Sequence, residues 1–291
     1  MKRIRFEFIA IGLFLLSGTT GCFADSRTKE LKLHDIAYGK ESLHKMDVDL
    51  IANRTSETPL VILIHGGGWM AGDKKDAYFM RDGLLAAGIN VININYRLAS
   101  PGNSIHYKEM MADIDEALSF VIANAKRWNI RDSQFIFWGG SAGAHLALLY
   151  AYRYDKQDII SSVITLGAPT VLDTFFSMEG AKPQDVEGLL PLITGKPWSY
   201  DSTKLAREYK EASPYYSPIY KPTMLIHGEA DDIVPLEQSL VMRQKLKEEN
   251  IADTLIIIPG GGHGGEGASQ EFYHRLNTAM FEWIIKYSKK Q

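Results

Sequence analysis

Residues 134–145 read Gln-Phe-Ile-Phe-Trp-Gly-Gly-Ser-Ala-Gly-Ala-His, and this stretch decides the fold. Its apolar run 135–138 is typical of a buried strand, and residues 142–154 have the composition of a helix. Between them lies Gly139-Gly140-Ser141-Ala142-Gly143, a match to the pattern G-x-S-x-G. A sharp turn from strand to helix places the central residue in strained backbone and exposes its hydroxyl, while the glycines keep side chains out of the crossing. The stretch therefore predicts a strand, a nucleophilic Ser141 and a helix.

The sequence on both sides of this stretch alternates between strand and helix patterns. The expected strands occupy residues 60–64, 89–94, 135–138, 163–166, 223–226 and 254–258, and the expected helices occupy residues 75–87, 107–127, 142–154, 236–249 and 269–287. Such alternation predicts the α/β class, with a mostly parallel sheet covered by helices on both faces. Two alternating runs at 33–38 and 45–50 predict an antiparallel hairpin at one sheet edge.

The alternation stops between residues 168 and 222, a stretch rich in proline and aromatic residues. A loop of this length inside a compact domain is usually functional. We interpret it as a small lid or pocket wall. Its Phe175, Phe176 and Trp198, together with Trp69, are the candidate substrate-pocket residues.

A nucleophilic serine needs a base, and the chain offers eight histidines. His263 lies in a glycine-rich loop just beyond the last expected strand. Ligands bind at that edge of an open α/β sheet, so His263 is the candidate base. His145, one helical turn beyond Ser141, is expected to be a packing residue, and His227 a structural residue that bonds the backbone.

The base in turn needs an acid that orients it, and this acid should also follow a strand. Asp231 and Asp232 both follow the strand expected at 223–226. Asp231 is the preferred candidate and Asp232 the second, with Asp173 a distant third.

The donors for the developing oxyanion are predicted at the end of the first buried strand, where the chain reads His65-Gly66-Gly67-Gly68-Trp69. Consecutive glycines let backbone N–H groups approach an incoming carbonyl oxygen without hindrance from side chains. The N–H of Ala142, at the positive end of the helix after Ser141, is a further candidate donor.

Several motifs together resemble the α/β-hydrolase superfamily: His65-Gly-Gly-Gly-Trp69, Asn95-Tyr-Arg-Leu98, Gly139-Gly-Ser-Ala-Gly143, His227-Gly-Glu-Ala-Asp231 and Gly261-Gly-His263. Within it, Trp69 and Gly72-Asp-Lys74 are similar to the BD-FAE-like esterases, which lie near the hormone-sensitive-lipase-like carboxylesterases and the kynurenine formamidases. The resemblance covers about residue 33 to the C-terminus. It implies Ser141 as nucleophile, His263 as base, Asp231 as its partner, and an oxyanion hole formed by Gly67, Gly68 and Ala142.

The resemblance implies a serine carboxylesterase that hydrolyses short-chain, carbohydrate-linked or aryl-linked acyl esters through an acyl-enzyme. Hormone-sensitive-lipase-like enzymes carry a helical cap before the glycine motif. Here we expect no such N-terminal cap, which leaves the pocket roof to residues 168–222. The alternatives are an aryl formamidase-like amide hydrolase and a non-catalytic envelope binding protein built on a hydrolase fold.

Composition excludes several other classes of function. The chain has 291 residues, of which 45% are hydrophobic and 23% charged, enough for one large domain. The net charge of −3 and the absence of a dense Lys/Arg run argue against a nucleic-acid partner. A match to G-x-G-x-x-G at Gly260, Gly262 and Gly265 lacks the helix and the acidic residue that dinucleotide binding requires. We expect no cofactor and no metal.

The N-terminal segment has the features of an export signal. Basic residues at its start precede an apolar run at 8–16, which is too short to span a bilayer. Cys22, the only cysteine in the chain, follows this run, so an internal disulfide is impossible. The segment resembles a bacterial lipoprotein signal, in which such a cysteine carries the lipid; an ordinary signal peptide cut nearby is the alternative.

These features predict how the chain is divided. Residues 1–21 are expected to be a removed signal, residues 22–32 a tether, and residues 33–291 the hydrolase domain. The irregular stretch at 168–222 inside this domain is called the excursion below. The expected location is the bacterial cell envelope, with the protein held at the membrane through lipid on Cys22.

Overall fold

The computed structural model describes residues 28–178 and 188–289. The predicted signal at 1–21 and Cys22 lie outside these residues. Within the described ranges, no helix is both long enough and apolar enough to cross a bilayer.

One eight-stranded sheet, in the order β1-β2-β4-β3-β5-β6-β7-β8, forms the centre of the molecule. The strands are β1 (Leu31–Ala37), β2 (Lys45–Leu50), β3 (Leu60–Ile64), β4 (Asn90–Ile94), β5 (Phe135–Gly140), β6 (Ile160–Leu166), β7 (Thr223–Gly228) and β8 (Asp253–Ile258). β1 pairs with β2, and β2 with β4, in antiparallel register, whereas the strands from β4 to β8 are parallel. The predicted edge hairpin and parallel sheet are both present.

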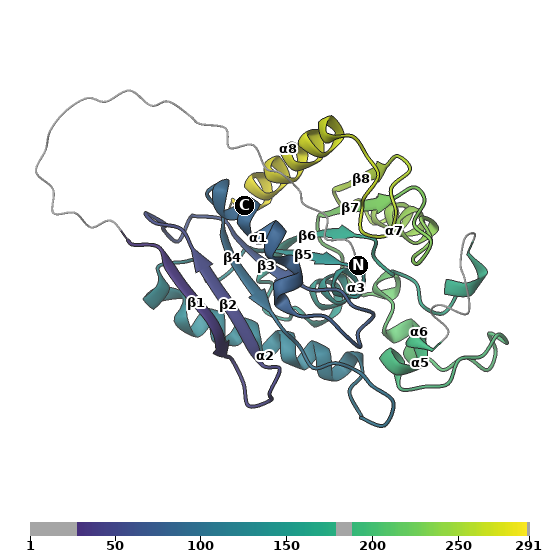
Figure 1. The fold of residues 1–291 in the computed structure, drawn as a ribbon. Coiled ribbons are helices and arrows are strands. Elements are labelled where there is room, and N and C mark those ends of the chain that lie inside the picture. The colour runs from purple at the N-terminus through teal and green to yellow at the C-terminus, as the bar shows by residue number, and fades with distance from the viewer. Residues whose placement is uncertain (1–27, 179–187, 290–291) are drawn as a thin grey trace, which may run out of the picture.

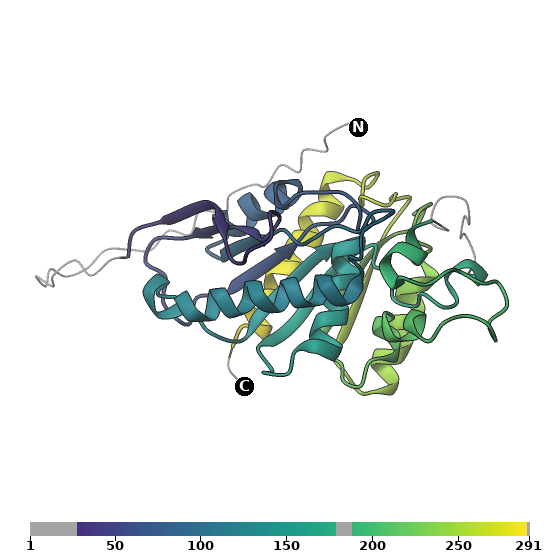
Figure 2. The ribbon, with the colours of Figure 1, turned by 90° about the horizontal axis from the view of Figure 1, so that it is seen from below.

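Helices cover both faces of this sheet (Figures 1 and 2). They are α1 (Tyr78–Ala86), α2 (Tyr107–Trp128), α3 (Ala142–Leu149), α7 (Glu237–Glu248) and α8 (Gln270–Tyr287). Buried apolar residues of α2, α3 and α7 form one core with one face of the sheet, and those of α1 and α8 form a second core with the other. The inner strands β3, β4, β5 and β7 are therefore buried on both faces, which explains their apolar runs, whereas the edge strand β8 is only partly buried.

Three elements differ from the sequence-based expectation. The helix expected at 75–87 begins as a 3-10 helix, η1 (Lys74–Ala77), and α1 starts only at Tyr78. The helix after Ser141 ends as α3 at Leu149 and continues as one π-helical turn, η2 (Tyr150–Tyr154). β6 begins at Ile160 instead of residue 163. The Asp155 carboxylate accepts the backbone N–H groups of Ile159 and Ile160 at 3.0 and 2.9 Å, which fixes the start of this strand.

The excursion at 168–222 contains short helical elements, drawn in green beside the sheet in Figure 1. They are η3 (Phe175–Ser177), α5 (Leu189–Thr194), α6 (Glu208–Glu211) and η4 (Pro214–Tyr216). Its first residues are anchored to α7, because the buried Gln238 side chain accepts the backbone N–H groups of Thr170 and Val171 at 2.7 and 2.8 Å. The excursion thus starts from a fixed point on the main domain.

Candidate active site

Ser141 occupies the sharp turn between β5 and α3, with φ 53° and ψ −123°. A non-glycine residue in such a conformation is strained by about 1–3 kcal/mol, and such strain is concentrated at functional sites. The flanking glycines make the crossing possible. A Cβ on Gly143 would lie 2.2 Å from the carbonyl oxygen of Ile64, and one on Gly139 would lie 2.5 Å from the carbonyl of Gly143.

Three predicted residues meet at this turn and form the candidate triad: Ser141, His263 and Asp231. His263 Nδ1 lies 2.8 Å from Asp231 Oδ2, and His263 Nε2 lies 2.8 Å from Ser141 Oγ. An ionised carboxylate can only accept, so the ring proton sits on Nδ1. Nε2 is then free to accept the hydroxyl proton of Ser141, which is the arrangement of a general base.

Asp231 is held as an ionised carboxylate. Burial favours its neutral form, but hydrogen bonds from His227 and His263 outweigh burial, and the pKa of Asp231 lies well below its usual range. Its Oδ1 also accepts the backbone N–H groups of Ile233 and Val234 at 3.0 and 2.9 Å. These bonds fix the carboxylate plane, so that Oδ2 faces His263.

The other two candidate acids lie elsewhere. Asp232 is exposed, and the carboxylate that His263 Nδ1 contacts is that of Asp231. Asp173 accepts a hydrogen bond from the Tyr216 hydroxyl at 3.1 Å, in the excursion.

Gly167 was not identified from the sequence, yet the triad needs it. Its φ is +60°, and a Cβ there would lie 3.2 Å from Asp231 Oδ2 and 3.2 Å from two ring atoms of His263. A side chain there would be strained by the positive φ and would require Asp231 or His263 to shift by a few tenths of an ångström. The available signal was a glycine directly after an expected strand, beside the strand that carries the serine.

The oxyanion loop, residues 65–69, packs against the serine turn. A Cβ on Gly66 would lie 2.8 Å from the carbonyl oxygen of Gly140 and 3.3 Å from Ser141 Cβ. Gly67 and Gly68 have positive φ values of 112° and 59°. In the part of the chain that the structure describes, their N–H groups and that of Ala142 donate no hydrogen bond to the backbone of a turn or loop. These three groups, called the oxyanion amides below, can therefore bind a charge that develops beside Ser141.

A buried lysine fixes the segment that follows the oxyanion loop. Lys74 is 1% exposed, and its ammonium contacts the carboxylates of Asp35 at 2.5 Å and Asp47 at 3.4 Å. Its backbone N–H donates to the Asn95 side chain at 2.6 Å, and Asn95 in turn donates to Asp73 at 2.8 Å. The Gly-Asp-Lys and Asn-Tyr-Arg motifs of the sequence thus meet behind the loop and brace it.

The three predicted pocket residues whose side chains the structure describes do not form an open aromatic wall. Trp69 and Phe175 are 4% and 2% exposed and belong to the core, so their assignment to a pocket wall is corrected. Trp69 turns inward because its indole N–H bonds to His145 at 3.2 Å. Trp198 is partly buried and packs on Tyr209, while the Phe176 side chain lies outside what the structure describes.

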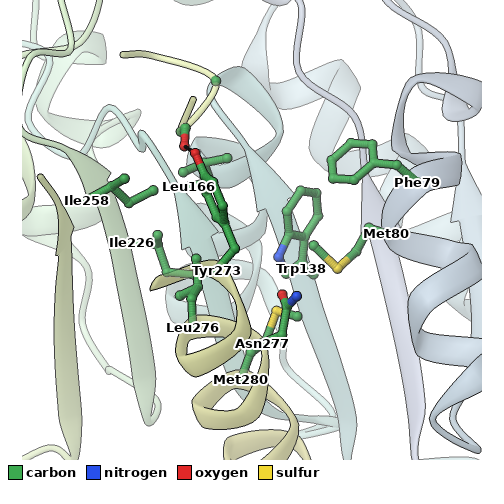
Figure 3. Close-up of a pocket in the computed structure, with 12 residues that line it drawn as sticks. Phe79, Met80, Trp138, Leu166, Ile226, Ile258, Tyr273, Leu276, Asn277 and Met280 are labelled. Carbon is green, nitrogen blue, oxygen red and sulfur yellow. Dashed lines mark hydrogen bonds between the residues drawn. The ribbon is translucent and has the colours of Figure 1, made fainter. Parts of the chain in front are cut away.

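An apolar hollow lies on the face of the sheet that α1 and α8 cover. Its volume is about 470 Å³, counting the part open to solvent. In Figure 3, Trp138 of β5 stands between Phe79 and Met80 of α1 and the α8 residues Tyr273 and Leu276. Gly264 and Gly265, which follow His263, border it, but no residue of the candidate triad lines it. The hollow is therefore adjacent to the base loop without being part of the serine site.

The fold and this site define a serine hydrolase of the α/β-hydrolase class. Comparisons with known proteins then identify the family within this class. The model of the family described as BD-FAE matches residues 46–246, so the chain belongs to that family. A truncated carbohydrate esterase from gut microbiota superposes with a TM-score of 0.70 and 22% identity, covering 92% of this chain and 99% of its own. Esterase Est2 of Thermogutta terrifontis, with butyrate bound, superposes with a TM-score of 0.66 and 19% identity, covering 89% and 94%. These likenesses establish the fold.

Curated relatives are similar over part of their length. The chain is 25% identical over 230 residues to endo-1,4-beta-xylanase B of Butyrivibrio fibrisolvens, covering 73% of this chain and 33% of that protein. It is 28% identical over 236 residues to the probable carboxylic ester hydrolase LipM of Mycobacterium tuberculosis, covering 74% and 51%. The chain therefore spans between a third and about half of these relatives.

Proposed function

We propose that the protein is a carboxylesterase that uses Ser141 as nucleophile. The observation that carries the proposal is the unbroken chain of contacts from Asp231 through His263 to Ser141, 2.8 Å at each step, beside the oxyanion amides. A binding protein would have no need of a strained serine hydrogen-bonded to a base.

The geometry assigns each step of ester hydrolysis to a group. Ser141 Oγ attacks the acyl carbon and its proton passes to His263 Nε2, while the oxyanion amides bind the developing charge. His263 then gives the proton to the leaving alkoxide, and an acyl-enzyme remains. Water then loses a proton to His263 Nε2 as its oxygen attacks the acyl carbon. The bond from that carbon to Ser141 Oγ breaks, Oγ takes the proton back from His263, and the acid leaves. Asp231 stabilises the imidazolium in both halves of the reaction.

The substrates we propose are esters of short acyl groups carried by carbohydrates or aryl alcohols. Support comes from the similarity to an endo-1,4-beta-xylanase over 230 residues and from the likeness in fold to a carbohydrate esterase. An aryl amide hydrolase is the second candidate, because 135 residues are 30% identical to kynurenine formamidase of Danio rerio. The same groups can attack a formamide.

The test has two arms. A fluorophosphonate probe should label the wild-type chain at Ser141, which separates a hydrolase from a binding protein. Turnover of p-nitrophenyl acetate, acetylated xylan and N-formylkynurenine then separates the two candidates. A chain that cleaves the formamide at least tenfold faster than the esters would replace the esterase proposal with the second one.

We predict an optimum at short acyl chains. Leu189 of α5 lies over the oxyanion loop, within 3.4 Å of where a Cβ on Gly68 would stand, while Trp69 and Phe175 are packed away in the core. Each acyl methylene adds about 0.8 kcal/mol only while it finds apolar surface to cover. We expect kcat/KM on p-nitrophenyl esters to rise from acetate over a few carbons and then fall. A maximum at about twelve carbons or more would mean a deep acyl channel and would contradict this prediction.

We also propose that the protein is exported and anchored through lipid on Cys22, as the sequence of the first 22 residues suggests. Stable attachment needs two or more acyl chains, which lipoprotein maturation provides. Cys22→Ser should move the protein from the membrane fraction to the soluble fraction or leave it unprocessed. Mass spectrometry of the mature N-terminus checks this. An unmodified N-terminus downstream of residue 22 would argue for an ordinary signal peptide instead.

A further inference from the structure

His145, one turn after Ser141 on α3, is fully buried, and both of its ring nitrogens form hydrogen bonds. Nε2 lies 2.7 Å from the carbonyl oxygen of Ala212, and Nδ1 lies 3.2 Å from the indole nitrogen of Trp69. A carbonyl oxygen can only accept and an indole N–H can only donate. The proton of the ring must therefore sit on Nε2, and Nδ1 accepts from Trp69. Burial lowers the pKa of His145 to about 4, which keeps this neutral form at ordinary pH.

Trp69, the last residue of the oxyanion loop, has a backbone conformation that needs stabilising contacts such as this hydrogen bond. It follows Gly67 and Gly68 and shares their positive φ, at 61°. Unlike glycine, tryptophan in this left-handed conformation is disfavoured by about 1–2 kcal/mol. Two bonds keep it there: its carbonyl accepts the N–H of Ala99 at 2.9 Å, and its indole donates to His145. The indole also meets the imidazole edge to face, with ring centres 5.2 Å apart.

His145 thus joins three segments that are distant in sequence. It sits on the helix that follows the nucleophile, it holds the end of the oxyanion loop through Trp69, and it donates to Ala212, the residue that ends α6 in the excursion. Trp69 is adjacent to Gly68, whose N–H is one of the oxyanion amides. A shift of the indole would be transmitted directly to that donor.

We propose that His145 is a positioning residue for the oxyanion hole, acting through the hydrogen bond that Nδ1 accepts from Trp69. The kinetic part of this inference rests on the proposed esterase function. Oxyanion donors act on the transition state and contribute little to binding of the neutral ester. Loss of the bond should therefore lower kcat and leave KM nearly unchanged, whereas a general loss of fold would lower the active fraction instead.

Two substitutions of the same residue separate its two bonds. In His145→Asn, the side-chain oxygen can take the place of Nδ1 and accept from Trp69, but the bond to Ala212 is lost. In His145→Gln, the side-chain nitrogen can take the place of Nε2 and donate to Ala212, but the bond to Trp69 is lost. Both variants lose one buried bond, so a purely structural role predicts similar losses in the two.

We expect His145→Gln to lower kcat on p-nitrophenyl acetate about tenfold, since small misplacements at a catalytic site have effects of this order or larger. His145→Asn should retain most of kcat. Trp69→Phe should reproduce the loss of His145→Gln, and the double variant should lose about tenfold rather than a hundredfold, because the two residues act through one bond. Trp128→Phe is the control: Trp128 is also 4% exposed, but it is the last residue of α2, and its carbonyl accepts a hydrogen bond from Arg54 instead of bracing the oxyanion loop.

The active fraction of each variant is titrated with the fluorophosphonate probe, and the indole N–H resonance of Trp69 is followed by NMR. That resonance should move upfield in His145→Gln and stay near its wild-type position in His145→Asn. Equal kcat in Asn and Gln variants, or multiplicative losses in the double variant, would overturn the inference. Failure of the esterase proposal would look different, because the wild-type chain would then react with neither ester nor probe. In that case the NMR measurement still tests the hydrogen bond: an unchanged indole resonance in His145→Gln would show that Trp69 does not donate to His145.

Discussion

Ser141→Ala should abolish ester turnover, with kcat on p-nitrophenyl acetate lower by roughly five to six decades. The substitution removes the oxygen that attacks the acyl carbon and the proton that His263 accepts. What remains is binding and the oxyanion amides, which by themselves accelerate hydrolysis by about 10³ to 10⁴ over water. Alanine keeps the Cβ that the backbone already carries at φ 53°, so the strain of the turn is unchanged and the fold should persist.

The melting temperature and the circular dichroism spectrum of this variant check that it is folded. Ser56→Ala is the matched control, because Ser56 is an exposed serine in the turn before β3 and is remote from the candidate triad. It should leave both turnover and probe labelling intact. Near-normal turnover in folded Ser141→Ala would mean that another residue is the nucleophile.

Much of this site follows from the order of residues along the chain. In a parallel sheet all strands end at one edge, so residues placed directly after strands must meet there. Ser141 follows β5, Asp231 follows β7 and His263 follows β8, and strand-end position alone brings the three together. The glycines around Ser141 could be interpreted from sterics, since only glycine fits where strand and helix cross.

The remaining features depend on side-chain direction, which strand and helix periodicity do not specify. Both Asp231 and Asp232 follow β7, and the choice is made by the tight turn in which Asp231 accepts the N–H groups of Ile233 and Val234. His145 was expected to be a packing residue and is buried, but a buried imidazole also needs hydrogen-bond partners, and these come from the oxyanion loop and the excursion. Such partners are far away in sequence, and no local pattern reveals them.

Asp231→Asn should lower kcat by about four decades and leave the fold intact. The amide oxygen of asparagine can still accept the N–H groups of Ile233 and Val234, so the turn is preserved. Its NH₂ group then faces His263 Nδ1, where a carboxylate oxygen stood at 2.8 Å. A donor at this position requires Nδ1 to be unprotonated, which moves the ring proton to Nε2. His263 would then present N–H to Ser141 and could not accept its proton.

The neighbouring residue provides the control for this assignment. Asp232→Asn makes the same chemical change one position later, on an exposed side chain, and should alter kcat by less than about threefold, as surface substitutions usually have small effects. If the two variants rank in the reverse order, Asp232 is the partner of His263 and the turn after β7 differs from the one described. The pH profile adds a second distinction. With the carboxylate gone, the electrostatic support for imidazolium is lost, so the remaining activity of Asp231→Asn should increase toward alkaline pH, where hydroxide can replace the base.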